Sequence, residues 1–375
     1  MIKGRTLAGL AVAGVLLAGA AWYLGGDRAP SESEAEGRLL FPGLHDALNT
    51  IHRIEVTAED GAFTLELQDG VWLLPERNRY PADTRKAREF LVGVAGLKIR
   101  SPKTANPALY EKLELNDPSE EGSRARAVVL HDAEGAVRAS LIVGRRRPAA
   151  DPALNQYFVR LADDPQTWLV EGVIDTPRTP PEWLARGDFL NIERNTIREV
   201  RVVHPDARPI VVTRAAAADE FTLEAIPEGH TLANQFSLND IVDLFVDPMF
   251  DDVSLAAGIR FGGSKATMTT FDGLQVEMEQ GTGEWSDYIR LAARVTENAT
   301  EDAAEEATED KDAGGDAADD ADITVADSAQ VRAEALNRRW QGWAWQLPGF
   351  RIGKLTQTLE QLIEVREKQG DESDG

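Results

Sequence analysis

One alternating pattern of apolar and polar residues occurs twice along the chain. IHRIEV, residues 51–56, returns as IREVRV, residues 197–202. Period-two spacing of apolar residues is typical of a strand with one buried face. The elements that follow each occurrence also come in a similar order, which predicts two copies of one domain. The alternative is a chance similarity between two ordinary α+β domains.

In the first copy, the pattern predicts a three-stranded meander and then a helix. Residues 51–56, 63–67 and 71–74 alternate, and the Asp-Gly pairs at 60–61 and 69–70 are typical of hairpin turns. Asp83 is a suitable N-cap for a helix. The apolar face of this helix is formed by Phe90, Leu91, Val94 and Leu97. Further strands are predicted at 127–130, 140–143, 157–161 and 168–170.

The second copy is predicted to repeat this order. Strands are expected at 197–203, 209–213, 220–223, 259–261, 266–271 and 274–278. A helix is expected from Ser237, with Ser237 and Asp240 as a capping box. YFVRLA at 157–162 matches DYIRLA at 287–292, and the next strand is expected at 343–345. Leu355, Leu359, Leu362 and Ile363 predict a final amphipathic helix.

The predicted fold class is therefore α+β, with two tandem similar sheet-rich domains after one N-terminal transmembrane helix. Each domain is an antiparallel meander with a packed helix. The predicted organisation along the chain is a membrane anchor or signal peptide at 1–26, a polar tether at 27–38, a first repeat at 39–175, a linker at 176–189, a second repeat at 190–365 that contains an acidic insertion at about 294–330, and a polar tail at 366–375.

The first residues of the chain predict passage through a membrane. Residues 7–24 carry no charge and would form a helix of about 27 Å, close to the ~30 Å of a hydrocarbon core. Lys3 and Arg5 precede this segment, so the positive-inside rule places the N-terminus in the cytoplasm and the body in the periplasm. Trp22 and Tyr23 are the expected interface aromatics. A cleaved signal peptide is the alternative, because residues 18–20 (AGA) suit a signal peptidase.

Charge and composition exclude some classes of partner and some kinds of chemical site. The net charge of −24 disfavours nucleic acid and anionic lipid surfaces as partners of the body as a whole, because like charges repel. Residues 297–327 hold thirteen acidic residues and one basic residue, so half of the net charge is local. The chain has no Cys, which removes disulfides, thiolate nucleophiles and Cys-ligated metals.

The short motifs in the chain do not predict a catalytic or ligand site. GIRFGGSK, residues 258–265, lacks the Gly-Lys-Ser/Thr end of a phosphate loop and is interpreted as a tight turn between strands. The acidic run at 310–322 has Ala321 where a calcium loop needs its twelfth ligand. GRRRP, residues 144–148, is interpreted as a solvated turn, with contact to an acidic partner as the alternative. No catalytic, cofactor-binding or metal-binding residue is predicted.

Several segments resemble a bacterial family, the domain of unknown function 4340. They are FPGLHDALNTIHRIEV, DGVWLL, YPADTRKAREFL, SPKTANPALYEKLELNDP and LIVG, together with the charged-start apolar leader. The resemblance covers residues 40–190 well and the second half more loosely. Because members are often encoded beside a gliding-type ABC transport system, the resemblance implies an envelope accessory role. It implies no catalytic residues.

Together these features predict a non-enzymatic, single-pass inner-membrane protein with its body in the periplasm. Its expected partners are an envelope protein complex, such as ABC transporter subunits, and the membrane itself. One alternative is a periplasmic binding protein for a glycan, peptide or lipid that uses a cleft between the copies. Another alternative is an envelope hydrolase.

Overall fold

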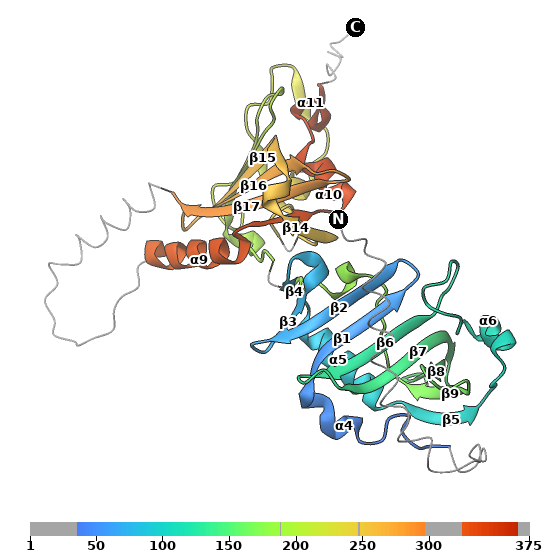
Figure 1. Cartoon of the computed structure of the whole chain (residues 1–375). Coiled ribbons are helices and arrows are strands. Elements are labelled where there is room, and N and C mark those ends of the chain that lie inside the picture. The colour runs from blue at the N-terminus through green and yellow to red at the C-terminus, as the bar shows by residue number, and fades with distance from the viewer. Residues whose placement is uncertain (1–35, 188, 247, 297–324, 367–375) are drawn as a thin grey trace, which may run out of the picture. The chain divides into compact units, whose positions relative to one another are not determined.

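The computed structural model describes residues 36–187, 189–246, 248–296 and 325–366. The chain divides into two compact units, unit 1 (Met1–Ala185) and unit 2 (Arg186–Gly375), and this boundary falls within the predicted linker at 176–189. Both units are built mainly from antiparallel sheet with a few helices, so the chain is α+β (Figure 1).

Unit 1 is a nine-stranded sheet in the order β4-β3-β2-β1-β6-β7-β8-β9-β5. The strands are β1 (Ile51–Ala58), β2 (Gly61–Gln68), β3 (Val71–Leu74), β4 (Tyr80–Pro81), β5 (Lys98–Pro102), β6 (Arg126–Asp132), β7 (Val137–Pro148), β8 (Asn155–Leu161) and β9 (Thr167–Gly172). The helices are α4 (Leu44–Ala47), α5 (Thr84–Ala95) and α6 (Tyr110–Leu113), with short 3₁₀ turns at Leu48–Thr50, Pro75–Arg77, Pro107–Leu109 and Pro180–Trp183.

Local sequence explains the start of this unit, and the predicted meander and helix are confirmed. Asp69 and Gly70 both have positive φ, as the tight turn between β2 and β3 requires. Asp83 caps α5 by accepting a hydrogen bond of 3.0 Å from the Lys86 amide. Phe90 of α5 is buried and meets the ring of Trp183 edge-on, with centroids 5.5 Å apart.

Unit 1 has a second, smaller core on the outer face of its sheet, defined here as the face opposite α5. The connection from β5 to β6, residues 103–125, contributes Tyr110 and Leu115 to it. Ile142, Phe158 and Leu169 contribute from the sheet, and their neighbours in sequence point to the opposite face because strand side chains alternate. The sheet of unit 1 is therefore covered by apolar side chains on both faces in this area.

Unit 2 has an eight-stranded sheet in the order β12-β11-β10-β15-β16-β17-β18-β14 and a two-stranded sheet, β13-β19. The strands are β10 (Ile197–Val203), β11 (Ile210–Thr213), β12 (Thr222–Leu223), β13 (His230–Leu232), β14 (Asp252–Leu255), β15 (Arg260–Thr270), β16 (Leu274–Thr282), β17 (Asp287–Val295), β18 (Trp343–Gln346) and β19 (Ile363–Val365). The helices are α7 (Phe236–Val242), α9 (Val325–Trp340), α10 (Gly349–Leu355) and α11 (Leu359–Leu362), with 3₁₀ turns at Arg194–Thr196 and Ala256–Gly258. Helices α7 and α10 pack on one face of the larger sheet, and its other face is called its outer face here.

Three local predictions for unit 2 are wrong. The Gly-Gly pair at 262–263 is a bulge inside one continuous strand, β15, rather than a turn, because the pairing register shifts between Phe261 and Lys265 and Gly262 has φ +130°. Helix α7 begins at Phe236 without the predicted capping box, and the Asn234 side chain accepts from the Phe236 amide instead. The predicted final helix is two short helices and a strand, divided at residues 356–358.

The acidic insertion is also shorter than predicted. Strand β17 extends to Val295 and helix α9 begins at Val325, so the predicted range of about 294–330 overlaps ordered elements at both ends. The predicted anchor at 1–26, most of the tether, the bulk of the insertion and most of the tail lie outside the described residues. Among the residues that the structure describes, no helix is both long and apolar enough to cross a membrane.

Candidate functional site

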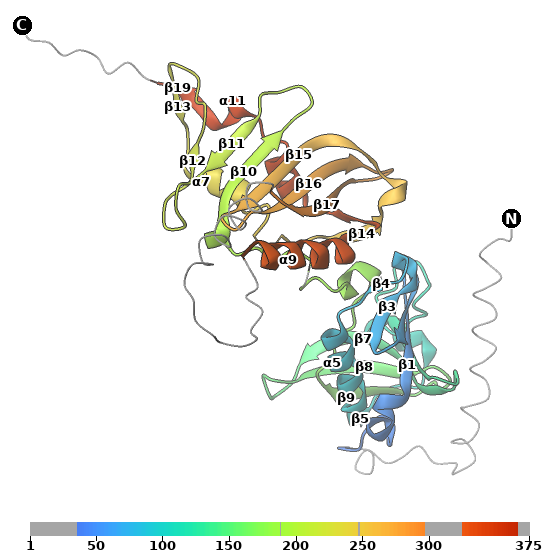
Figure 2. The same ribbon diagram turned by 90° about the vertical axis from the view of Figure 1, so that its left-hand side faces the viewer.

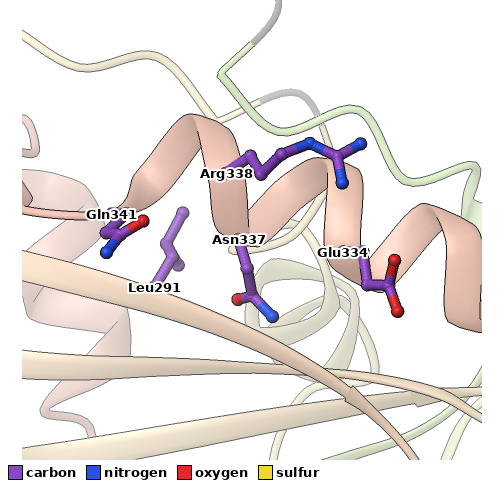
Figure 3. Close-up of a pocket in the computed structure, with 5 residues that line it drawn as sticks. All are labelled: Leu291, Glu334, Asn337, Arg338 and Gln341. Carbon is purple, nitrogen blue, oxygen red and sulfur yellow. The ribbon is translucent and has the colours of Figure 1, made fainter.

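A pocket of about 370 Å³ lies where helix α9 passes beside strand β17 in unit 2 (Figures 2 and 3). One apolar side chain, Leu291, comes from the strand. Glu334, Asn337 and Arg338 come from α9, and Gln341 directly follows the helix. Their spacing of three and four residues puts them on one side of the helix. Figure 3 shows Asn337 directed toward the strand, whereas Arg338 extends away from it.

Asn337 fixes α9 against the edge of the sheet. Its side chain accepts a hydrogen bond of 2.8 Å from the Ala293 amide and donates one of 2.7 Å to the Ala293 carbonyl. It thereby takes the place of a neighbouring strand, because β18 pairs with β17 only at Ile289 opposite Trp345 within the described chain. At the end of the helix, the Trp340 indole donates to the Phe189 carbonyl at 2.8 Å.

The chemistry of this pocket suits weak recognition of polar groups. Glu334 accepts a hydrogen bond of 2.9 Å from Gln330 on the preceding turn, so its carboxylate is held on the helix surface. The Asn337 amide is already occupied by Ala293, which leaves Glu334, Arg338 and Gln341 as the groups that can meet a ligand. One acidic, one basic and one amide group match a peptide-like partner better than an apolar one.

A smaller pocket of about 190 Å³ lies in unit 1 beside α6. It is lined by Glu111, Glu114, Asn116, Gly122, Ser123 and Arg124. The Arg124 guanidinium lies 3.5 Å from the Glu114 carboxylate, so the opposite charges in this pocket are partly satisfied by each other. Such an exposed pair contributes at most ~1 kcal/mol to stability.

A buried histidine and serine form the arrangement in the described residues that most resembles a nucleophile and base. Nδ1 of His204, just after β10, lies 2.9 Å from Oγ of Ser264 on β15. The two residues are only 9% and 6% exposed, so the hydroxyl faces the interior of unit 2 and not solvent. Nε2 of His204 has no hydrogen-bond partner among the described residues. The pair joins the end of β10 to an interior position of β15, and a substrate would reach it only if unit 2 opened.

A second histidine forms an ion pair on the outer face of unit 1. Nε2 of His131 lies 3.5 Å from a Glu55 carboxylate oxygen on the neighbouring strand. The interaction with Glu55 raises the pKa of His131, although burial opposes the charged form. The same interaction lowers the pKa of Glu55. Both shifts favour the charged pair.

The residues singled out in the sequence are not brought together. Lys3, Arg5, Trp22 and Tyr23 lie outside the described residues, as does the acidic run at 310–322. The arginines of GRRRP belong to strand β7, so their interpretation as a turn is wrong. In the described ranges, no group of three or more His, Asp or Glu side chains is arranged to hold a metal ion.

A comparison with protein families gives a match. The model of the domain of unknown function (DUF4340) matches residues 72–255. The chain belongs to this family. The DUF4340 match begins at Trp72 in strand β3 of unit 1 and ends at Leu255 in strand β14 of unit 2, so it includes parts of both units. No curated protein and no solved structure matches the chain.

Sequence reasoning missed the residues that organise the two pockets and the buried pair. No sequence pattern marks Asn337 as a residue that bonds the edge of a sheet in place of a strand, because this role depends on where β18 begins. His204 and Ser264 are 60 residues apart, and only the pairing of β10 with β15 brings them together. The Gly-Gly pair at 262–263 was a usable signal, since paired glycines inside a strand pattern indicate a bulge.

Proposed function

We propose that this DUF4340 protein is a membrane-tethered envelope interaction module without enzymatic activity, which assembles with a protein complex such as an ABC-type transport system. In this proposal the N-terminal segment anchors the chain in the inner membrane and the body lies in the periplasm. The sequence of residues 1–26 supports the anchor, and the family resemblance supports the association with a transport system.

We also propose that units 1 and 2 are two copies of one domain. The strand orders support this, because apart from the edge strand β4 of unit 1, β3-β2-β1-β6-β7-β8-β9-β5 and β12-β11-β10-β15-β16-β17-β18-β14 connect their strands in the same succession. Each unit places one helix, α5 or α7, after its first three strands and before the strand that becomes a sheet edge. Unrelated α+β domains would match at every position of such an order only rarely.

The observation that carries the interaction role is the distribution of exposed large apolar side chains. Among the residues that the structure describes, those that are more than 60% exposed are all in unit 2, namely Phe236, Met249, Trp285, Val331, Phe350 and Val365. The most exposed counterpart in unit 1 is Val173 at 57%. Aromatic residues and Met are enriched in protein interfaces. Unit 2 is therefore proposed as the partner-binding unit.

Crosslinking in intact membranes tests this role. We expect a transport-complex subunit to be recovered with the wild-type chain and recovery to fall at least fivefold in W285S/F350S. V92S, which changes an exposed residue of α5 in unit 1, is the control. Recovery of the monomer alone would contradict the proposal. A reporter fused at the C-terminus tests location separately, because a cytosolic signal would contradict the periplasmic body.

The pocket beside α9 favours a second candidate, a binding protein for a polar ligand such as a peptide or glycan. A thermal-shift screen tests it, because a ligand that binds only the folded state raises the melting temperature with concentration. R338A/Q341A should abolish such a shift. The hydrolase alternative depends on the His204–Ser264 pair, and activity that survives S264A would exclude that pair as its centre.

A further inference from the structure

The hairpin formed by β7 and β8 in unit 1 carries three consecutive arginines, Arg145, Arg146 and Arg147, which are all exposed. No ion pair joins any of them to a described residue. The Arg145 guanidinium lies over the Phe158 ring, 5.3 Å from its centroid. Six other described arginines of unit 1 do have carboxylate partners, such as Arg138 with Asp132 and Arg79 with Glu66.

The net charge of the body is expected to repel an anionic surface, but the tip of this hairpin is locally basic. Residues 36–185 contain 23 acidic and 19 basic residues, which gives a net charge of 19 − 23 = −4 for unit 1 against −24 for the whole chain. The tip of the hairpin, residues 149–154, holds one carboxylate, Asp151, and its side chain accepts from the Ala153 amide. The corresponding hairpin of unit 2, between β16 and β17, has no Lys or Arg in residues 281–287.

The sheet register places the arginines at the end of unit 1 where the tether enters. Leu39 pairs with Lys98, Lys98 with Glu171, Glu171 with Gln156, and Gln156 with Arg147. These five residues form one row across neighbouring strands, which appear in the same order in Figure 1 as β5, β9, β8 and β7. At ~4.8 Å per strand, Arg147 lies roughly 19 Å from Leu39.

This row sets the distance between the hairpin and the proposed membrane anchor. The predicted tether, 27–38, has twelve residues and spans at most ~40 Å when fully extended. The hairpin is therefore held within reach of the bilayer surface from which the tether emerges. Electrostatic interactions in solution act over a Debye length of ~8–10 Å. Acidic residues further than this from the hairpin therefore oppose its attraction to an anionic surface only weakly.

We propose that Arg145, Arg146 and Arg147 bind the phosphate groups of anionic phospholipids in the membrane that anchors the chain. Guanidinium groups suit this role because they are always charged and donate paired hydrogen bonds to phosphate oxygens. Contact with the bilayer orients unit 1 and leaves unit 2 further along the chain for protein partners. This inference rests on the proposed tethering.

The native chain contains no Cys, so single labels can be placed cleanly. The probe is the full-length A150C variant, labelled with an environment-sensitive fluorophore and reconstituted in vesicles of phosphatidylcholine with or without 30% phosphatidylglycerol. Ala150 is exposed at the hairpin tip. The control label is A133C, in the turn at the opposite end of β7, a strand of twelve residues or roughly 40 Å.

We expect the A150C label to be shielded from an aqueous quencher only in the anionic vesicles, and 0.5 M salt to reverse the shielding. R145Q/R146Q/R147Q should lower the ratio of docked to free hairpin on the order of 100-fold, since each arginine near an anionic surface contributes about 1 kcal/mol. R79Q/R85Q/R88Q removes three exposed charges of unit 1 that lie outside the row between Leu39 and Arg147, and should leave the shielding unchanged.

Equal quenching of A150C in both vesicle types would overturn the inference, as would shielding that persists in the triple variant. Shielding that appears only after a purified acidic membrane protein is added would replace the lipid with a protein partner. A carbonate wash separates the two proposals. Loss of the chain from the vesicles contradicts the tether, whereas a retained chain with an unshielded label contradicts lipid binding by the hairpin.

Discussion

Units 1 and 2 differ most in the connection that crosses the outer face of the sheet. In unit 1 the chain takes residues 103–125 to pass from β5 to β6, and it builds the second core there. In unit 2 the connection from β14 to β15 takes only residues 256–259. When Arg160 is aligned with Arg290, the sheet positions under the two connections are Ile142 and Phe158 in unit 1, and Glu279 and Tyr288 in unit 2.

Both sheets nevertheless have the same two residue types, a glycine and an arginine, at matching positions beside these connections. A Cβ on Gly144 would lie 2.4 Å from the Leu113 carbonyl oxygen, and one on the corresponding Gly281 would lie 2.6 Å from the Phe261 ring. Arg160 stacks over Tyr110 at 4.9 Å, and Arg290 stacks over Phe261 at 4.4 Å. The comparison teaches that the long and the short connection place the same demands on the sheet. Each has a glycine where the chain passes close to the sheet, and each has an arginine stacked on a nearby aromatic ring.

Loss of the second core is the largest effect expected. Leu115 is fully buried there, so L115A should destabilise unit 1 by about 2–5 kcal/mol through lost transfer energy and a cavity. Urea unfolding and protease cleavage within 103–125 measure this cost. L109A, in the same connection but 36% exposed, is the matched control and should change stability by less than about 1 kcal/mol. Equal effects of the two variants would mean that this core does not stabilise the unit.

The two glycines should differ in their tolerance of a methyl group. G144A meets backbone oxygens, which cannot move independently, and should cost about 2–3 kcal/mol. G281A meets the side chains of Ile259 in the short connection and Phe261 in β15, which can shift, and should cost closer to about 1 kcal/mol. G258A places its methyl group in open space and is the control. Hydrogen exchange of each unit reports the change, and a reversed order would contradict the shared role.

Replacement of the two arginines separates stacking from charge pairing. R160M should lose about 0.5–1 kcal/mol of stacking. R290M should lose more, about 1–3 kcal/mol, because the Arg290 guanidinium also donates at 2.7 Å to Glu279, which is 8% exposed and would be left unpaired. The double variant R290M/E279M should recover part of the loss. Additive effects in this cycle would show that the pair is not coupled.

The smallest effect expected is a pH dependence confined to unit 1. His131 has a raised pKa, so its contribution to stability is complete below its ordinary 6.5 and is lost as the pH rises through the folded-state value. Glu55 has a lowered pKa, so its contribution is complete above 4.5 and is lost at lower pH. The pair should stabilise unit 1 most between about pH 4.5 and 6.5.

Partial exposure limits this pH effect to at most about 1 kcal/mol. Unit 2 has Thr269 where unit 1 has His131, since Met268 and Leu130 occupy matching positions in the ladders. Urea unfolding at pH 5.5 and pH 8 should therefore show a difference for unit 1 that H131Q abolishes. An equal pH dependence in unit 2 would place its origin in another residue.

Alternation predicted most of the ladder, because positions such as Ile54 and Val200 must be apolar to face a core. The alternation pattern failed to predict elements whose secondary structure depends on contacts with distant parts of the chain. Strands β5 and β14 are short sheet edges with few apolar residues, and no period marks them. The Gly262 bulge joined two predicted strands into one. The apolar spacing of Leu355, Leu359 and Leu362 suited one helix, but Thr358 caps a new one.

The candidate sites were the least predictable part of the molecule. The arginines of GRRRP were visible in the sequence as a charge run, but only the register showed that Arg147 shares a row with Leu39. The His131–Glu55 pair, the His204–Ser264 pair and the Asn337 contact each join residues that are distant in sequence. Such contacts follow from strand order, which a single sequence specifies only through the fold as a whole.

The amide of Asn337 also has a consequence for solubility. A strand border with free amide and carbonyl groups can recruit a strand from another molecule, which is a common first step in aggregation. Asn337 occupies both groups of Ala293 at the border where β18 no longer follows β17. A single side chain thus covers the backbone groups near the end of β17. The segment that follows β17 can then vary in length without exposing these groups to a strand of another molecule.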